Sequence, residues 1–493
     1  MGALHQGHLE LIRRAAAPRW WGEPKVLVSI FVNPLQFGAG EDFSRYPRRL
    51  VEDGQLAQKA GAHAVFAPPP EEIYPQGEGG VTHVVPPATL LRSLCATQRP
   101  GHFEGVATVV TRLLALVRPE RLFLGEKDWQ QLVVMRQVVT DLGLPVAIEA
   151  MATVRQSNGL ALSSRNSYLS PEELKQAALF PAALAEAAAI AGGGEAAPAV
   201  LRRLEHTLRR HNLPPDYVAL VNAHTLEPLE HLEGLALLAA AVHCGPARLI
   251  DHLFLMHRPP IVAIDGPAGA GKSTVTRGLA HRLGLTYLDT GAMYRALTWW
   301  VLKQGVNPAD PLAIAPLLDA VDLILEQNEE GNLKIQVNGT DVTTAIRSPE
   351  VTAVVSTVAA HPCVRKSLTS LQRRLGERGG LVAEGRDTGT AVFPDADCKI
   401  FLTASVAERA RRRAKDLRER GFTVPDLAEL EGQIAERDAK DSSRSEAPLR
   451  QAPDALLLIT DGMEIEAVIE AMVDAFRSKV PEEAWPSAQA GPG

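Results

Sequence analysis

The sequence contains little cysteine, few aromatic residues and no excess of positive charge. Its four cysteines lie far apart and form no C-x-x-C pair, so neither a disulfide framework nor a zinc site is indicated, and a reduced cytosol is the simpler setting. The net charge of −7 argues against a general binder of nucleic acid or of membrane surfaces, because such proteins usually carry a basic excess. The most apolar stretch, "LEGLALLAAAVHC", is too short to span a bilayer, and the first residues show no apolar signal segment. We therefore expect a cytoplasmic protein with no nucleic-acid or membrane partner.

The chain of 493 residues is longer than one hydrophobic core normally supports, and its strand pattern predicts two α/β units. Short apolar runs alternate with longer helical patterns in both halves, which is typical of mainly parallel sheets. The expected strands are "KVLVSIFV", "HAVFAP", "RLFLG" and "PVAIEAM" in the first half and "IVAIDG", "LVAEG", "CKIFLT" and "ALLLITDG" in the second.

Shifts in composition place the domain boundaries. The prolines of "HRPPIV" precede a fresh strand, so we expect one domain over residues 1–255 and another over 256–480. Within the first domain, Ala-rich helical sequence and the Gly-rich "AGGGEAAPA" divide an α/β part, 1–170, from a smaller lobe, 171–255. The end of the chain, 481–493, has the composition of a disordered tail.

The second half opens with a buried strand, the pattern G-x-x-x-x-G-K-S and a helix, in "IVAIDGPAGAGKSTVTRGLAHRL". This context is typical of a P-loop, in which backbone N–H groups surround nucleotide phosphates, the lysine adds positive charge and the serine hydroxyl contacts Mg²⁺. The alternative is a Gly-rich turn that binds nothing. The predicted ATP-binding residues are Gly266, Gly269, Gly271, Lys272, Ser273 and Thr274, with Ser273 as the metal contact.

Polar residues follow the next two expected strands of this half, in "YLDTGAMYRAL" and "LVAEGRDTGTAVF". Open α/β sheets bind their ligands at the carboxyl ends of the strands, so these side chains are candidates for holding the phosphate acceptor. They are Asp289, Thr290, Tyr294, Arg295, Glu384, Arg386 and Asp387.

With these blocks, and with "VSTVAAHPCVR" and "ERDAKDSSR", residues 261–478 resemble bacterial cytidylate kinase, a P-loop nucleoside-monophosphate kinase. The resemblance implies ATP-dependent phosphorylation of CMP or dCMP, with Mg²⁺ bound together with ATP and with Lys272, Arg386 and Arg437 in phosphoryl transfer. Several arginines suit this reaction, because guanidinium groups hold the spread negative charge of a transferring phosphoryl group. The CMP-binding residues that the resemblance implies are Asp289, Tyr294, Arg295, Ser356, Arg365, Arg386, Asp387, Arg437, Asp441 and Arg444.

The basic run "ERARRRAKDLRERG" invites a nucleic-acid interpretation. Its interspersed acidic residues, Glu408, Asp416 and Glu419, and its helical spacing favour a mobile, partly solvated lid helix instead. Asp397, at the start of an expected strand, is interpreted as structural rather than as a metal ligand.

The chain begins with "MGALHQGHLELI", in which two histidines stand three residues apart at the expected start of a helix. Helix N-termini favour bound phosphate, so His5 and His8 are candidate phosphate contacts; the alternative is that both imidazoles only pack on the sheet. Four further polar blocks, "SIFVNPLQF", "RPGHFEG", "LFLGEKDWQQL" and "NGLALSSRNSYLS", follow expected strands or form loops. Their candidate residues are Asn33, Gln36, Arg99, His102, Lys127, Asp128, Gln131, Ser163, Ser164 and Arg165.

In this order the blocks resemble pantothenate synthetase (pantoate–β-alanine ligase) over residues 1 to about 252. The resemblance implies a Rossmann-like nucleotidyltransferase of the HIGH type with a small C-terminal lobe, and a homodimer formed through this domain. Such enzymes use ATP to join pantoate to β-alanine through a pantoyl adenylate, releasing AMP and diphosphate. The implied catalytic residues are His5, His8, Lys127 and Arg165, and the implied pantoate contacts are Gln36 and Gln131. The implied ATP-binding residues are Met1, His5, His8, Gly125, Lys127, Asp128, Ser163, Ser164 and Arg165. Arg99 and His102 either contact substrate or have a structural role.

That family normally begins with a strand and a Pro-Thr pair before the methionine of "MGALH", and this sequence has neither. We therefore expect Met1 to be an internal methionine and the sheet to lack a central strand, with neighbouring strand edges exposed.

Three functions compete for the whole chain. One is a bifunctional ligase and CMP kinase, in an order that resembles a fusion known in cyanobacteria. The second is a CMP kinase whose truncated, inactive ligase domain serves docking or dimerisation, and the third is a P-loop regulatory or nucleic-acid-binding ATPase. The intact polar residues of the first half favour the first function over the second, and the third does not explain the "GRD" and "ERDAKDSSR" blocks.

Overall fold

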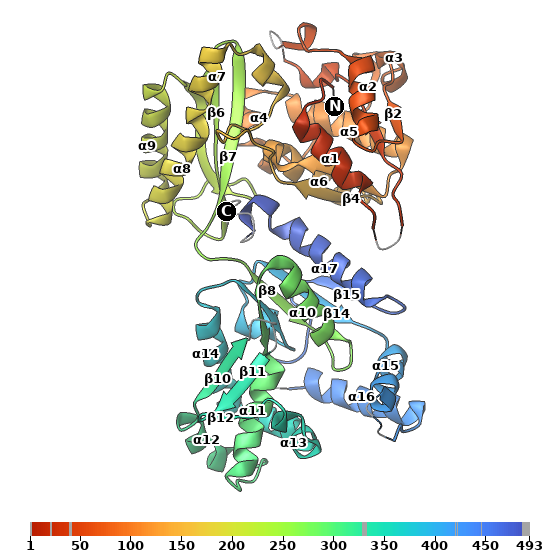
Figure 1. The fold of residues 1–493 in the computed structure, drawn as a ribbon, viewed down its shortest axis with the longest axis vertical. Helices are drawn as coiled ribbons and strands as arrows, with labels where there is room; N and C mark the ends of the chain where they lie inside the picture. Colours follow the sequence, from red (N-terminus) through yellow and green to blue (C-terminus); the bar gives the residue numbers. More distant parts are fainter. Residues whose placement is uncertain are drawn as a thin grey trace. The chain divides into compact units, whose positions relative to one another are not determined.

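A computed structural model describes residues 2–19, 22–38, 42–327, 333–419, 421, 423–444 and 446–485. The chain forms two compact units, coloured red to yellow-green and green to blue in Figure 1. Unit 1 contains Met1–His257 together with Pro481–Ala484, and unit 2 contains Arg258–Val480 and the residues from Trp485 onward.

The larger part of unit 1 contains two pairs of parallel strands, each connected by a helical crossover. One pair is β1 (Leu27–Ser29) with β2 (Ala64–Phe66), and the other is β3 (Arg121–Gly125) with β4 (Ala147–Met151). The four strands lie where the sequence predicts them. Among the described residues no strand bridges β1 and β3, so the expected parallel sheet is divided into two pairs. The principal helices are α1 (Gln6–Ala16), α2 (Leu50–Lys59), α5 (His102–Val117) and α6 (Trp129–Asp141).

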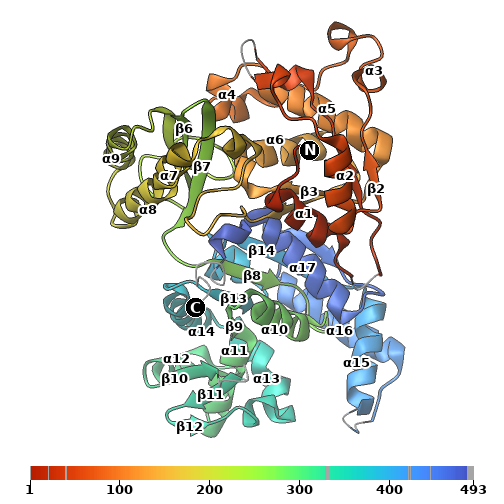
Figure 2. The same cartoon turned by 45° about the horizontal axis from the view of Figure 1, so that its top comes forward.

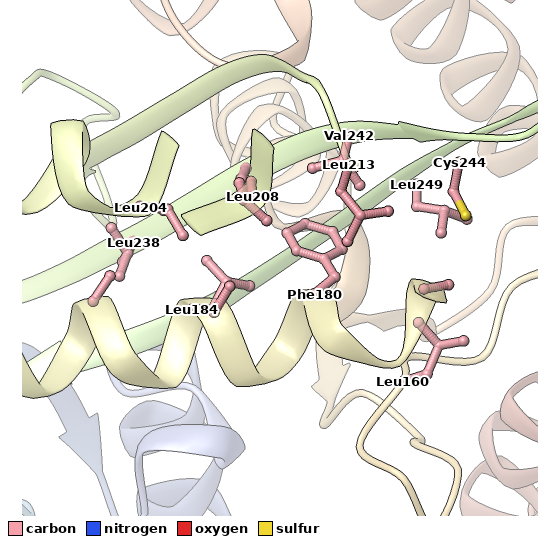
Figure 3. Packing of buried hydrophobic residues seen from close by; sticks show 14 of the residues in the cluster. Leu160, Phe180, Leu184, Leu204, Leu208, Leu213, Leu238, Val242, Cys244 and Leu249 are labelled. Atoms are coloured by element: carbon pink, nitrogen blue, oxygen red, sulfur yellow. The ribbon is translucent and has the colours of Figure 1, made fainter. Parts of the chain in front are cut away.

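The smaller lobe of unit 1 packs helices against an antiparallel sheet (Figure 3). Phe180 and Leu184 of α8 are fully buried and belong to one apolar core with Leu204 of α9 and Leu238 of β6. The stretch Pro171–Gly192 is long and apolar enough by composition to cross a membrane, but its buried side chains belong to this core. The elements are α7 (Pro171–Ala177), α8 (Leu179–Gly192), α9 (Ala197–Arg210), β5 (Pro215–Asn222), β6 (Leu235–Cys244) and β7 (Ala247–Met256).

Unit 2 is built on a five-stranded parallel sheet in the order β15-β14-β8-β13-β9. The central strand β8 is buried along its whole length, which explains its unbroken apolar sequence "IVAI". The strands are β8 (Ile261–Asp265), β9 (Thr286–Asp289), β13 (Leu381–Glu384), β14 (Cys398–Thr403) and β15 (Leu456–Ile459).

Helices flank this parallel sheet, and a small antiparallel sheet packs against α11 (Thr290–Lys303), as Figures 1 and 2 show. The small sheet contains β10 (Leu323–Gln327), β11 (Leu333–Val337) and β12 (Thr340–Asp341). The helices are α10 (Lys272–Leu283), α11 (Thr290–Lys303), α12 (Pro311–Asp319), α13 (Pro349–Ala360), α14 (Pro362–Gly376), α15 (Val406–Glu419), α16 (Leu427–Ser442) and α17 (Ile465–Lys479).

The C-terminal residues differ from the sequence-based expectation of a disordered tail beginning at residue 481. That expectation is wrong for Pro481–Trp485, which the structure describes and which contains a short 3₁₀ helix, η9 (Glu482–Ala484). Composition misled here because two glutamates and a proline suit a solvated tail, whereas both glutamate side chains are largely buried. Residues 486–493 lie outside the described residues.

Candidate active sites

The histidine pair lies at the start of α1. His5 is the N-cap, and its Nδ1 accepts a hydrogen bond from the Gly7 backbone N–H at 3.2 Å; His8 Nδ1 accepts from the His5 backbone N–H at 3.3 Å. An Nδ1 that accepts leaves the neutral ring with its proton on Nε2, so both rings keep an N–H donor for a ligand. Burial, with the neighbouring His5, lowers the pKa of His8 to about 3, and burial also lowers the pKa of His5. Both imidazoles are therefore neutral donors near pH 7.

A buried carboxylate from α2 fixes the backbone ahead of this helix. Asp53 is 2% exposed and accepts hydrogen bonds from the N–H groups of Ala3 (2.9 Å) and Leu4 (2.7 Å). Sequence reasoning missed Asp53, because an acidic residue in the first turn of an amphipathic helix is usually solvated. Its two bonds orient the segment that ends at His5.

Gln36 is held by the residues whose role the sequence left open. His102 Nδ1 donates to the Gln36 carbonyl oxygen at 2.8 Å, and Arg99 donates to the same oxygen at 3.3 Å and lies 3.1 Å from His102 Nε2. Asn33 is buried and donates to the Gly105 carbonyl at 3.0 Å. Arg99 and His102 thus position Gln36, while both also line a cavity.

The remaining predicted ligase residues come from two chain segments. Lys127 and Asp128 lie in a 3₁₀ turn, η5 (Glu126–Asp128), directly after β3, with Lys127 Nζ 3.6 Å from the Asp128 carboxylate. Ser163 caps a second 3₁₀ turn, η6 (Ser164–Tyr168), and the hydroxyl of Ser164 lies 3.2 Å from that of Tyr46. Tyr46 is a contact for which no sequence motif gave a signal.

One cavity of about 900 Å³ collects these residues. A second cavity of about 520 Å³ shares Lys127, Asp128, Gln131, Ser163 and Arg165 with it and extends toward the smaller lobe. Met1 lies outside the described residues. The predicted residues that line the larger cavity are His5, His8, Asn33, Gln36, Gly125, Lys127, Asp128, Gln131, Ser163, Ser164 and Arg165.

In unit 2 the Gly-rich loop joins β8 to α10. Gly266 needs the absence of a side chain, because a Cβ there would lie 1.9 Å from the Leu402 carbonyl oxygen. Lys272 is buried and donates to the carbonyl oxygens of Gly266 (2.8 Å) and Pro267 (2.9 Å). Burial, and then the nearby Arg386, lower the pKa of Lys272 to about 7.

Glu384 at the end of β13 connects the P-loop to its neighbours. Its two carboxylate oxygens accept from Ser273 Oγ (2.8 Å) and Tyr287 Oη (2.7 Å), and its carbonyl accepts from Thr290 Oγ1 (2.7 Å). Ser273 and Glu384 are hard oxygen donors of the kind that Mg²⁺ prefers. Among the described residues no group of three or more His, Cys, Asp or Glu side chains could hold a metal ion.

Arginines and aspartates form a cluster of ion pairs among the residues that the sequence predicts for the acceptor. Asp441, 1% exposed, pairs with Arg444 and accepts from Arg386 Nε at 2.7 Å, and Arg365 pairs with Asp387. Arg365 also lies over the Tyr294 ring, 5.5 Å from its centroid.

Arg437 differs from the paired arginines of this site. Its Nε is buried without a hydrogen-bond partner among the described residues. Burial, followed by repulsion from Arg386 and Arg295, lowers the pKa of Arg437 to about 10. An unpaired guanidinium held among like charges marks a place where an anion binds favourably.

The remaining predicted residues of this site are spread over α10, α11 and α13. Asp289 caps α11 by accepting from the Ala292 N–H at 2.9 Å, and Arg295 donates to Thr352 Oγ1 at 2.9 Å. Ser356 is half-buried in α13, and Thr274 is exposed on α10. Arg295 lies close enough to Arg437 for its charge to lower the pKa of Arg437. For Ser356 and Thr274, their places on α13 and α10 are the only structural support for the predicted roles among the described residues.

The basic helix α15 faces the P-loop. Arg409 donates to the Ala268 carbonyl at 3.1 Å and pairs with Asp438, and Arg412 donates to the Ala270 carbonyl at 3.2 Å. These contacts oppose the nucleic-acid interpretation, since two of the basic side chains are engaged within the nucleotide site. The sequence did not reveal the roles of Arg409 and Arg412, which a run of similar residues cannot distinguish. Asp397, as expected, is structural: it accepts from Arg258 and from the Ile261 N–H, both at 2.8 Å.

Together the two units define an adenylate-forming ligase of the HIGH type joined to a P-loop nucleoside-monophosphate kinase. Comparison with known families agrees: residues 1–254 match the family Pantoate-beta-alanine ligase, and residues 262–478 match the family Cytidylate kinase. The chain belongs to the bifunctional pantoate ligase/cytidylate kinase family, and its two activities are those of a ligase and a phosphotransferase.

Individual relatives span both units. The bifunctional pantoate ligase/cytidylate kinase of Prochlorococcus marinus (strain MIT 9313) is 58% identical over 99% of this chain and 96% of its own length. That of Parasynechococcus marenigrum (strain WH8102) is 59% identical over 99% of this chain and 95% of its own length. The crystal structure of pantothenate synthetase from Thermus thermophilus is 48% identical, with a TM-score of 0.48, and the match covers 51% of this chain and 90% of that one. None of these findings favours a kinase with an inactive ligase domain.

Proposed function

We propose that unit 1 condenses pantoate with β-alanine through a pantoyl adenylate. The observation that carries this proposal is the single cavity lined by both histidines, Lys127, Arg165 and two neutral amides. In the first step the pantoate carboxylate attacks the α-phosphorus of ATP and diphosphate leaves. In the second step the β-alanine amine attacks the acyl carbon of the mixed anhydride, and AMP leaves.

The charge that develops on the phosphates determines the proposed residue roles. His5 and His8 donate their Nε2–H groups to phosphate oxygens, and Lys127 and Arg165 add positive charge as diphosphate departs. Ser163 and Ser164 donate hydrogen bonds to the leaving group. The amides of Gln36 and Gln131 bind the hydroxyl and carboxylate groups of pantoate, with Arg99 and His102 holding the Gln36 backbone.

The ribose-side contacts of unit 1 are a further part of this proposal. Asp128 accepts hydrogen bonds from the ribose, and the Gly125 backbone lies beside the nucleotide where β3 ends. Closing the cavity around the adenylate would exclude water, which otherwise hydrolyses the mixed anhydride.

Unit 2 is proposed to transfer the γ-phosphoryl group of ATP to CMP or dCMP. Gly266, Gly269 and Gly271 let backbone N–H groups surround the ATP phosphates, and Lys272 exchanges its two carbonyl partners for phosphate oxygens. Ser273 would hold Mg²⁺ that binds together with ATP, and the ion would neutralise phosphate charge.

The acceptor nucleotide is proposed to bind the arginine cluster. Arg386, Arg437 and Arg444 hold the phosphates, and Arg437 provides the buried guanidinium that still has an open donor. Asp387 and Arg365 face the cytosine together with Ser356. Asp289, Tyr294 and Arg295 complete the acceptor pocket.

A homodimer formed through unit 1 and a cytoplasmic location are further proposals. The homodimer is supported by the family resemblance, and the cytoplasmic location by the fact that the buried side chains of Pro171–Gly192 belong to the core of the smaller lobe.

The decisive experiment assays both reactions on one preparation and on two variants. We expect Lys272→Ala to abolish CDP formation and to leave pantoate- and β-alanine-dependent AMP release intact. His8→Ala should do the reverse. Loss of both reactions in either variant would contradict two independent sites.

A further inference from the structure

The short segment Pro481–Ala484 is part of unit 1 although it follows the last helix of unit 2. It lies outside both matched family segments, which end at residues 254 and 478. Glu126 is fully buried, and its two carboxylate oxygens accept hydrogen bonds from the backbone N–H groups of Glu482 (2.7 Å) and Glu483 (3.2 Å). A buried carboxylate requires such partners, and among the described residues the hydrogen bonds that reach Glu126 come from this segment.

The two glutamate side chains of the segment bind other parts of unit 1. Glu482 forms an ion pair with Arg14 at 2.7 Å, in the last turn of α1. Glu483 accepts from the Thr153 backbone N–H at 2.8 Å and lies 3.5 Å from Arg155. Both glutamate side chains are only 14% exposed, so these charge-assisted contacts are largely removed from water and are stronger than surface pairs.

The elements that the segment contacts are those that carry the ligase side chains. Arg14 lies in the last turn of the helix that begins at the histidine pair, and Glu126 immediately precedes Lys127. Thr153 and Arg155 lie between β4 and the loop of Ser163. Three chain segments that line one cavity are therefore joined to one another through this short segment.

We propose that Pro481–Ala484 is a clip that completes the ligase unit and holds its phosphate-facing elements in register. Ligase turnover then depends on four residues located beyond the kinase sequence. This inference rests on the ligase roles proposed above for the histidines and Lys127, and Pro481–Ala484 does not line either of the two cavities described above. Glu482 and Glu483 are positioning residues.

The test uses two double variants of the full chain. Glu482→Ala with Glu483→Ala removes the clip side chains, and the control, Glu71→Ala with Glu72→Ala, changes an exposed Pro-Glu-Glu sequence of the same unit in α3 (Pro70–Ile73). We expect the clip variant to lower kcat for AMP release by about tenfold or more, because charge-assisted hydrogen bonds are lost. CDP formation should stay within about twofold of wild type, and the control should leave both reactions unchanged.

Hydrogen–deuterium exchange provides the second readout. Peptides that contain Glu126 and Thr153 should exchange faster in the clip variant and not in the control. Wild-type ligase turnover, or unchanged exchange at these peptides, would overturn the proposal.

A conservative variant keeps the test decisive if the double variant unfolds unit 1. Glu483→Gln preserves volume and the acceptor for Thr153 but removes the charge facing Arg155. We expect lower kcat with little change in the KM values and with native melting; wild-type kcat overturns the clip. Failure of the ligase proposal itself would show differently, as an inactive wild-type protein or an unaffected His8→Ala variant.

Discussion

Lys272 donates to the carbonyl oxygen of Gly266, 2.8 Å away, so in the free protein the P-loop lysine is bound to its own loop. Burial, and then the nearby Arg386, lower the pKa of Lys272 to about 7, and the nearby Glu384 and Asp265 offset this only in part. Nucleotide phosphates supply further negative charge, so binding favours the charged ammonium and raises its pKa.

We therefore predict that ATP binding to unit 2 takes up a proton at pH 8. Lys272 is mostly deprotonated above its pKa of about 7 and becomes charged in the complex, whereas at pH 6 it is charged in both states and this uptake vanishes. Calorimetry in two buffers of different ionisation enthalpy measures the uptake. Lys272→Arg stays charged, so its measured proton uptake comes from ATP itself and is subtracted from the wild-type value. Equal uptake by wild type and Lys272→Arg at pH 8 would refute the prediction.

Replacing His8 separates hydrogen bonding from charge in the ligase site. Because its pKa of about 3 keeps the imidazole neutral, His8→Gln should retain an N–H donor and lose about tenfold in AMP release, whereas His8→Ala should lose about 10²- to 10³-fold. CDP formation by the same preparations is the internal control. If Gln and Ala variants were equally impaired, a neutral donor would not be the role of His8.

Asp53 offers a test of how the backbone before α1 is fixed. Asp53→Ala leaves the N–H groups of Ala3 and Leu4 without their partner, which should destabilise unit 1 by about 1–3 kcal/mol and lower ligase turnover. The adjacent Glu52 is exposed, so Glu52→Ala is a matched control and should change neither. Urea denaturation measures the stability of unit 1, and the ligase assay measures turnover. If the Asp53→Ala and Glu52→Ala variants had equal stability and equal turnover, the two hydrogen bonds of Asp53 would not fix this backbone.

The charge cluster of unit 2 predicts a stability effect. Asp441→Ala leaves the guanidinium groups of Arg386 and Arg444 without their buried partner and should cost about 3–5 kcal/mol of unfolding free energy, with loss of CDP formation. Glu436 lies on the same helix and is exposed, so Glu436→Ala should remain within about 0.5 kcal/mol of wild type. Chemical denaturation of unit 2 distinguishes them. A loss of CDP formation without destabilisation would assign Asp441 a substrate contact instead.

Much of the fold could be predicted from local sequence. β3 and β14 begin and end at the residues of "RLFLG" and "CKIFLT", because short apolar runs bounded by polar or turn residues determine buried parallel strands. The P-loop and the ligase blocks could also be located from sequence, because each is a contiguous motif.

What sequence could not predict depends on contacts between distant residues. Asp53 meets Ala3 and Leu4 only after α2 packs beside α1, and Glu483 meets Thr153 across most of the chain. The composition of the tail likewise predicted disorder wrongly for Pro481–Trp485, because composition does not show which folded surface a charged segment will pack against. The conformation and contacts of such residues depend on partners that are distant in the sequence, and local pattern does not reveal them.

The discontinuity of unit 1 has a consequence for the order of biosynthesis. Since Pro481–Ala484 belongs to it, the kinase sequence is an insertion within the ligase unit in topological terms. A ribosome adds residues at about 5–20 per second, so on the order of tens of seconds separate the synthesis of His257 from that of the final piece of unit 1. During this interval Glu126 lacks its two backbone donors, whereas nearly all of the kinase unit, Arg258–Val480, is synthesised before those donors appear.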